Sequence, residues 1–246
     1  LFVISAVGIY KLETNNYVLD DLSEKSSLKK DMRFFESQFA GIRPFEMGFS
    51  LRDTSLTIFN IQVAQEIDTV QYYLENVYGA KMSYSAMTIM KEINRSINGG
   101  KQESYRVPNS IREMKNIKKY FDKNIDETAT STLLTKEGKK GRISSKIHDL
   151  GQKKVTELNH NLREFLNKNI HLVDFRITGA PDMMDKTSAY ISRQIIKGLI
   201  FSFLVVALLM GILFKSVKIA LISLIPNVLP LVFVAGLMGL IGIDLK

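Results

Sequence analysis

Two long uncharged runs near the end of this 246-residue chain constrain its fold more than any other feature. They are Gly198–Phe214 and Ile219–Ile243, and only Lys215-Ser216-Val217-Lys218 separates them. A bilayer core of about 30 Å needs roughly 20 apolar helical residues, and the second run alone would give about 37 Å. The sequence therefore predicts a transmembrane hairpin with spans at about 190–214 and 219–243. A buried hairpin of a soluble protein is the weaker alternative, because it seldom contains two such uncharged runs.

The connection between the two runs predicts how the hairpin is oriented. Lys215 and Lys218 are its charges, and the positive-inside rule places such a loop in the cytoplasm. Residues 11–196 are then expected on the opposite side, in the periplasm of a bacterial inner membrane. Leu1–Tyr10 is uncharged but too short to span, so we interpret residues 1–10 as the end of a truncated transmembrane helix. The multi-pass membrane part then comprises residues 197–246.

Charge is concentrated in the first four fifths of the chain. The residues before Lys197 carry 29 Lys and Arg against 24 Asp and Glu, a net charge of +5. So mild an excess is typical of a solvated surface, and we expect no nucleic acid as a partner. The chain has no cysteine, which excludes disulfides and thiolate metal sites.

Residues 11–196 show alternating helical and strand patterns. Strands are predicted at Arg43–Leu51, Ala80–Tyr84 and Leu172–Thr178, and a hairpin at Thr128–Thr135 and Arg142–His148. Five apolar stripes at helical spacing predict helices: Leu28 to Phe39, Val63 to Val77 before Gly79, Met87 to Ile97, Ile111 to Phe121, and Val155 to Phe165. The order predicts an α+β fold, similar to an elaborated ferredoxin-like sandwich, followed by the all-α hairpin.

The patterns of catalysis are missing, so we predict no catalytic residue, no metal site and no cofactor. The three histidines are too scattered for metal spacing, and Gly99-Gly100-Lys101-Gln102 lacks the spacing of a phosphate loop. Asp182 and Asp185 are interpreted as first-turn residues of the helix that enters the membrane. The acidic pairs Asp20-Asp21 and Asp126-Glu127 are interpreted as solvated, and Asn94-Arg95-Ser96 matches a glycosylation sequon.

A basic cluster follows one predicted helix, at Lys115, Lys118, Lys119 and Lys123. A solvated face is the default interpretation of such a cluster. Binding of an anionic lipid or of a partner is the alternative.

The second apolar run contains the residues most unusual for a spanning helix. Pro226 and Pro230 remove backbone donors and kink a helix, and the Asn227 amide needs a partner in hydrocarbon. A static packing kink and a hinge or pathway role both stay open. Gly236 and Gly239 are spaced to permit close contact with another helix.

Four segments of the chain resemble one half of a transporter of the resistance-nodulation-division (RND) superfamily, in its lipid-exporting MMPL and hopanoid-transporter-like branch. Its membrane part overlaps the sterol-sensing domain. The segments are LETNNYVLDDL (12–22), FESQFAGIRPFEMGFSL (35–51), DFRITGAPDM (174–183) and FKSVKIALISLIPNVLPLVFVAGLMGLIGIDL (214–245). The basic loop with the Pro-Asn-x-x-Pro segment is the most specific of these features.

The resemblance implies that residues 11–196 form a porter-type periplasmic domain that encloses an apolar substrate path. Export of hydrophobic or lipid-like molecules would be driven by the proton-motive force through acids on a later helix. The implied partners are membrane lipids, the substrate and the remaining half of the same polypeptide, and a homo-oligomer stays open. The alternatives are a sterol-sensing, receptor-like protein that binds a lipid or partner without pumping, and a membrane-anchored interaction domain.

Overall fold

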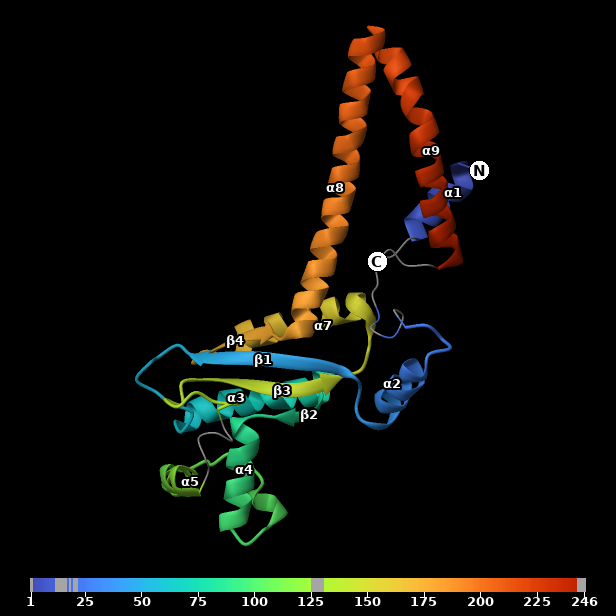
Figure 1. Ribbon diagram of the computed structural model, residues 1–246. Helices are drawn as coiled ribbons and strands as arrows, with labels where there is room; N and C mark the ends of the chain where they lie inside the picture. Colours follow the sequence, from blue (N-terminus) through green and yellow to red (C-terminus); the bar gives the residue numbers. More distant parts are fainter. Residues whose placement is uncertain (1, 12–16, 18, 20–21, 125–130, 243–246) are drawn as a thin grey trace. The chain divides into compact units, whose positions relative to one another are not determined.

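The computed structural model describes residues 2–11, 17, 19, 22–124 and 131–242, and the chain divides into two compact units (Figure 1). A helical unit contains Leu1–Tyr17, Gly151–Lys153 and Met184–Lys246. An α+β unit contains Val18–Leu150 and Lys154–Met183.

A four-stranded antiparallel sheet organises the α+β unit. Its strands are β1 (Arg43–Leu51), β2 (Lys81–Tyr84), β3 (Lys140–Ile147) and β4 (Val173–Thr178), in the spatial order β2-β3-β1-β4 (Figure 1). In the centre of the sheet, Met47 pairs with Ile143 on one side and Ile177 on the other. The α+β class and the strand predicted at Arg43–Leu51 are confirmed, because its alternation separates a buried face from a more polar one.

One face of the sheet packs against two helices, α3 (Ile61–Tyr73) and α7 (Gly151–Asn169). Met47 on β1 and Ile143 on β3 are fully buried, together with Ile67 of α3 and Leu162 of α7. Between β2 and β3 the chain forms α4 (Ala86–Ile97), a short 3-10 turn η3 (Gln102–Ser104) and α5 (Ile111–Asn124). The predicted helices are confirmed in this unit, including α2 (Ser27–Gln38).

The predicted stripe of the α3 segment is wrong at its last position. Val63, Ile67 and Leu74 are fully buried as expected, but Val77 is 59% exposed. The helix continues as a π-helical turn, η2 (Leu74–Tyr78), which holds an extra residue and rotates the following side chains. Tyr78 therefore takes the buried place that the α-helical period assigned to Val77.

The predicted hairpin is present only in part. Thr128, Ala129 and Thr130 lie outside the described residues, the next three form a turn, and Leu134 makes a single bridge to Gly141. Beyond that bridge, β2 pairs with the same edge of β3, at Ser144 and Lys146. Because β2 occupies this edge of β3, the segment that contains Leu134 cannot pair with β3 as far as Ser144, as the predicted hairpin required.

The helix α2 forms where it was predicted, but its apolar stripe does not join the core. Leu28, Phe35 and Phe39 are about half exposed, and the two rings pack against each other with centroids 5.2 Å apart. Polar contacts hold this helix instead. The Glu36 carboxylate accepts hydrogen bonds from the backbone N–H groups of Ile42 and Asp149, both at 2.8 Å.

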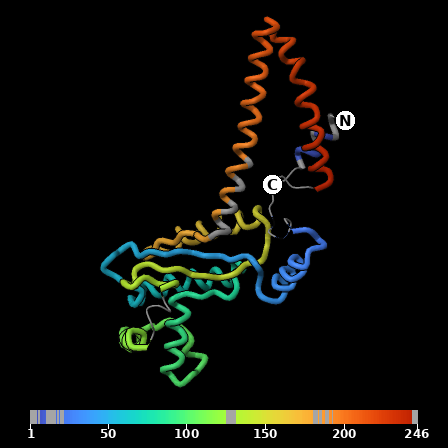
Figure 2. Tube along the Cα trace, in the orientation of Figure 1, coloured from blue at the N-terminus to red at the C-terminus, as the bar shows by residue number. Residues whose placement is uncertain are grey.

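The helical unit contains α1 (Phe2–Lys11), α9 (Val217–Ile241) and, from Met184 on, α8 (Ala180–Phe214), which the trace in Figure 2 follows. Two segments among the described residues, Arg193–Phe214 and Val217–Ile241, are long and apolar enough to cross a membrane. The connection is shorter than predicted. Lys215, with φ of 49°, and Ser216 make the turn, so Lys218 already lies in the first turn of α9 and the helix ends at 241 rather than 243.

Candidate functional site

The unusual residues of the second apolar run lie inside a continuous helix. Pro226, Asn227 and Pro230 are all exposed in α9, and the Asn227 amide makes no side-chain hydrogen bond with any described residue. An exposed amide on an apolar helix is suited to contact with a further helix. The two lysines, Lys215 and Lys218, are exposed at the turn and take part in no ion pair within the described ranges.

The glycines of α9 lie where α1 approaches. A Cβ placed on Gly236 would lie 2.5 Å from the Cα of Ser5, and one on Gly8 would overlap the Gly236 carbonyl. Gly239 is also buried. Gly242 has a different role, because its φ of 76° ends the helix in a left-handed cap. Close backbone contact between α1 and α9 therefore depends on small residues of both helices.

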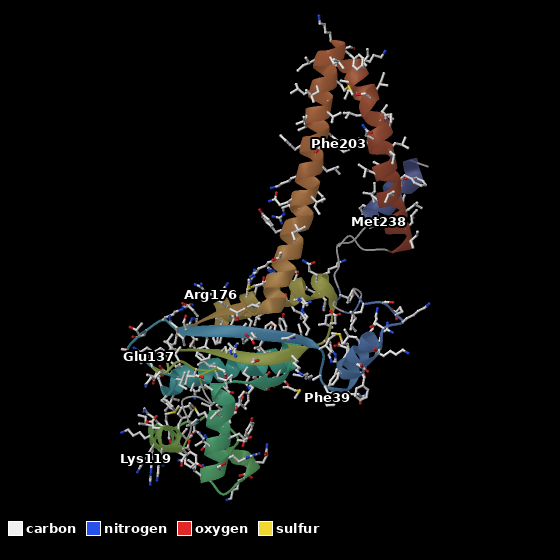
Figure 3. The ribbon with its side chains drawn as sticks, viewed as in Figure 1. Phe39, Lys119, Glu137, Arg176, Phe203 and Met238 are labelled. Carbon is white, nitrogen blue, oxygen red and sulfur yellow. The ribbon has the colours of Figure 1, made fainter. Side chains whose placement is uncertain are left out.

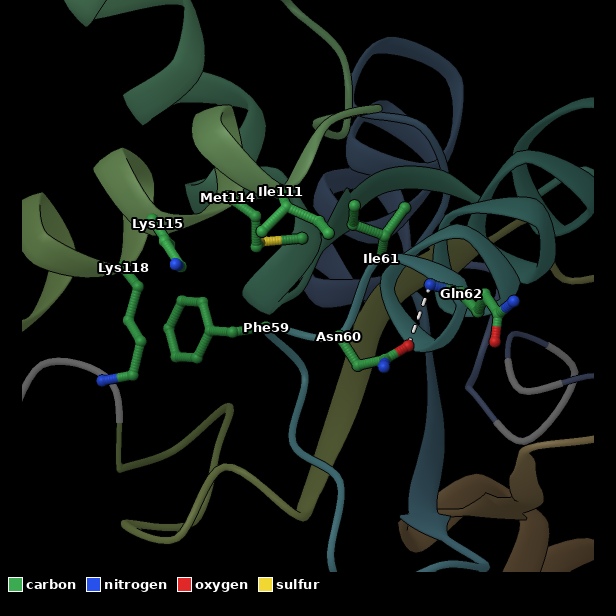
Figure 4. A pocket seen from close by; sticks show the side chains of 8 residues that line it. All are labelled: Phe59, Asn60, Ile61, Gln62, Ile111, Met114, Lys115 and Lys118. Atoms are coloured by element: carbon green, nitrogen blue, oxygen red, sulfur yellow. Dashed lines mark hydrogen bonds between the residues drawn. The ribbon is translucent and has the colours of Figure 1, made fainter.

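A pocket of about 590 Å³ lies in the α+β unit, between the start of α3 and one side of α5 (Figure 4). The α3 side is formed by Phe59, Asn60, Ile61 and Gln62. The α5 side is formed by Ile111, Met114, Lys115 and Lys118. The volume falls within the range of about 300–1,000 Å³ that is usual for small-molecule sites.

Local sequence explains how each wall forms. Asn60 has an extended backbone, and its Oδ1 accepts hydrogen bonds from the N–H groups of Gln62 (3.0 Å) and Val63 (3.2 Å), so α3 begins there. The four α5 residues have the spacing i, i+3, i+4 and i+7, which puts them on one side of the helix. One wall is thus the capped start of α3 and the other is a single face of α5.

The two pocket lysines differ in their surroundings. The Lys118 Nζ lies 5.3 Å from the centre of the Phe59 ring and pairs with Asp122. Lys115 is exposed and forms no ion pair with a residue that the structure describes. None of the eight lining residues is acidic. The pocket therefore combines an apolar wall with an uncompensated positive charge.

The helix α5 is anchored at its start by a charged pair. The Arg106 guanidinium donates to both carboxylate oxygens of Glu113, at 3.0 and 3.2 Å, and the Asn109 N–H donates to the same carboxylate. Mainly because of the Arg106 hydrogen bonds, the pKa of Glu113 is lowered from its ordinary value of 4.5. The carboxylate is therefore ionised at neutral pH and fixes the end of the helix that carries the pocket wall.

The sequon residue Asn94 belongs to the same anchor. Its side chain is fully buried, its amide donates to the Arg106 carbonyl at 3.0 Å, and its Oδ1 accepts from Asn98. A buried amide with these partners is not available to a glycosylating enzyme. The burial of Asn94 therefore argues against glycosylation at this sequon.

Other polar candidates form separate structural contacts. His148 contacts Glu36, His160 lies beside Glu164, and the backbone N–H of His171 donates to Glu66. No group of three or more potential metal ligands occurs within residues 2–11, 17, 19, 22–124 and 131–242. Asp20-Asp21 and Asp126-Glu127 lie outside the described residues. Asp182 and Asp185 fall in the first turns of α8, but their side chains are not described.

The sequence did not predict this pocket. The basic cluster and the apolar stripe of α5 were recognised only as separate faces of a helix, with a solvated face as the default interpretation of the lysines, and the α3 side was missed. An Asn directly before an apolar-periodic helix is a cap signal that could have located Asn60. No local sequence pattern indicates that Asn60 lies near α5, which begins 51 residues later in the chain.

No protein-family model matches this chain, and no curated protein is found to match it.

Proposed function

We propose that this chain is part of an RND-type exporter, driven by the proton-motive force, that moves hydrophobic or lipid-like molecules. The α+β unit would form part of the periplasmic substrate path. The observation that carries the proposal is the order of elements: one apolar helix (α1), an α+β unit, and then a hairpin of two long apolar helices (α8 and α9). This is the arrangement implied for the first helices and the porter domain of one RND half.

The topology of the sheet supports a porter-type, ferredoxin-like domain. Two β-α-β units, β1-α3-β2 and β3-α7-β4, form an antiparallel sheet with the order β2-β3-β1-β4. A split β-α-β pair gives this order when each helix crosses over a neighbouring strand. The segment with α4 and α5 is then an insertion between the two halves.

The contact of α1 with α9 supports a role inside a helical bundle. Gly8 and Gly236 let the two backbones approach closely, as small residues do between membrane helices. The exposed Asn227 is an available contact for a further helix. Because the hairpin has no acidic residue between Arg193 and Ile241, proton coupling would use acids elsewhere in the complete protein.

Topology is tested with single cysteines, because the chain has none of its own. Lys119→Cys probes the α+β unit and Val217→Cys the turn of the hairpin, and both positions are exposed. In spheroplasts, a membrane-impermeant maleimide should label Lys119→Cys before lysis and Val217→Cys only after lysis. The reverse order would overturn the proposed orientation.

Export is tested with the complete polypeptide in cells that contain a radiolabelled membrane lipid. Transfer of the lipid to an external acceptor should require the protein and stop when an uncoupler collapses the proton gradient. Transfer that the uncoupler leaves unchanged would overturn the proposal of a pump driven by the proton-motive force, and so would lipid binding with no transfer. The second of these outcomes would favour the receptor-like alternative.

A further inference from the structure

We infer that the pocket between the start of α3 and α5 binds an acyl chain that carries an anionic head group. The inference deepens the proposed handling of lipid-like molecules and rests on it. Binding at the pocket is nevertheless measured without transport, so each proposal can fail separately.

The apolar wall fits an acyl chain. Ile111 is 69% exposed and faces the pocket, and Phe59 and Ile61 are only partly buried across from it (Figure 4). Met114, which is buried, forms the inner part of the α5 wall. Covering exposed apolar surface of this kind favours binding, because it removes that surface from water.

The charges at the pocket fit an anion. Lys115 is a cation without an acidic partner among the described residues, and the lining contains no carboxylate. The pocket also adjoins the first turn of α3, which contains no acidic residue and carries the partial positive charge of a helix N-terminus. An anionic head group would therefore be attracted from both walls, whereas a cationic one would be repelled.

Lys118 would act differently from Lys115. Its ammonium is already paired with Asp122 and lies over the Phe59 ring. Lys118 therefore stabilises one wall of the pocket, and its charge is largely compensated. We therefore assign the head-group contact to Lys115. A single unpaired cation beside an apolar wall suits one acidic amphiphile better than a polyanion such as RNA, which needs an extended basic surface.

The chain contains no tryptophan, so an introduced indole is a specific reporter. Ile111→Trp places it in the pocket, and Tyr84→Trp places it at an exposed position of β2 that does not line the pocket. The probe is a dibrominated fatty acid, whose bromines quench tryptophan on contact, added to the full chain in nanodiscs. The Ile111→Trp reporter should be quenched saturably, and the Tyr84→Trp reporter only weakly and in proportion to concentration.

Three variants in the Ile111→Trp background test the charge. Lys115→Gln should weaken binding of the fatty acid about tenfold, the effect of losing one charge-assisted hydrogen bond. Asn60→Asp keeps the cap oxygen of α3 but adds a negative charge, so it should preserve thermal stability and yet weaken binding. Lys119→Gln removes a cation of the same helix that does not line the pocket, and it should leave binding unchanged (Figure 3).

The head group is identified by comparing probes. A brominated alcohol of the same chain length should bind more weakly than the fatty acid and be indifferent to Lys115→Gln. Brominated phosphatidylglycerol distinguishes a phospholipid from a free fatty acid as the source of the anion, and saturable binding of either supports the inference. Equal quenching of both reporters, or equal affinity for the alcohol and the acid, would overturn it.

Discussion

The Tyr78 hydroxyl donates a hydrogen bond of 2.7 Å to Oδ1 of Asn159, joining the π-helical end of α3 to α7. The Tyr78 ring is 2% exposed and packs against Phe45 of β1, with centroids 4.7 Å apart. The Tyr78 side chain thus contacts both the helix α7 and the central strand β1. It reaches this place because the π-turn rotates it inward.

Removing the hydroxyl should weaken this junction. Tyr78→Phe keeps the ring but loses the hydrogen bond, so we expect a loss of about 1 kcal/mol in unfolding free energy, because the half-buried Asn159 can be rehydrated. Tyr72→Phe is the matched control, since Tyr72 is 66% exposed. Denaturant titration followed by tyrosine fluorescence measures both. Equal stability of the two variants would contradict the role of the hydroxyl.

Loss of the buried Ser85 hydroxyl should lower the unfolding free energy more than loss of the Tyr78 hydroxyl does. The Ser85 hydroxyl donates to Gln71 at 2.6 Å and accepts from the Met87 N–H, so it both caps α4 and satisfies a buried amide oxygen. Ser85→Ala should cost about 2 kcal/mol, because the Gln71 oxygen loses its donor. Ser83→Ala is the control: the buried Ser83 hydroxyl has no hydrogen-bond partner among the described residues, so its removal should cost nothing.

The Arg106–Glu113 pair predicts a pH dependence of α5. A carboxyl whose pKa is lowered by folding stabilises the fold above its ordinary value of 4.5, and this stabilisation is lost as the pH falls through the folded pKa. Glu113→Gln should therefore reduce hydrogen-exchange protection of the α5 amides at neutral pH. The difference from wild type should shrink as the pH falls below 4.5.

The control for this experiment is Glu103→Gln, an exposed residue of the same insertion. It should not alter the protection of α5 at any pH. If the Glu113→Gln difference instead persisted undiminished in acid, the ionised carboxylate would not be the group that anchors the helix.

The contact between α1 and α9 predicts opposite effects for two glycine substitutions. Gly198→Ala in α8 meets nothing within 4 Å and should raise stability slightly, by the higher helix propensity of alanine. Gly236→Ala has the same propensity gain, but its Cβ would lie 2.5 Å from Ser5 and force the helices apart. The fraction that stays monodisperse after heating in detergent should fall for Gly236→Ala only. A gain for both would contradict the close approach.

The candidate site could be predicted from sequence only where its determinants are local. The apolar stripe from Ile111 to Phe121 and the basic cluster at Lys115 and Lys118 predicted a helix with these residues, but not that Ile111, Met114, Lys115 and Lys118 would share the wall of a pocket. Nothing in that pattern indicates that the start of α3 lies opposite α5, because this proximity depends on how the inserted helices pack.

The sequence by itself determined the periodic features: the two apolar helices, the alternation of Arg43–Leu51 and the end of a helix at Gly79. These follow from hydrophobic spacing and from the backbone freedom of glycine, which act over a few residues. The tertiary structure decided that β2 occupies an edge of β3, so residues 131–134 form a turn and a single bridge where a strand was predicted. It also decided that Val77 would face solvent while Tyr78 became buried, and that α2 would keep its aromatic side exposed. Those outcomes depend on which of several distant segments packs against a given surface, and the local spacing of residues does not determine this.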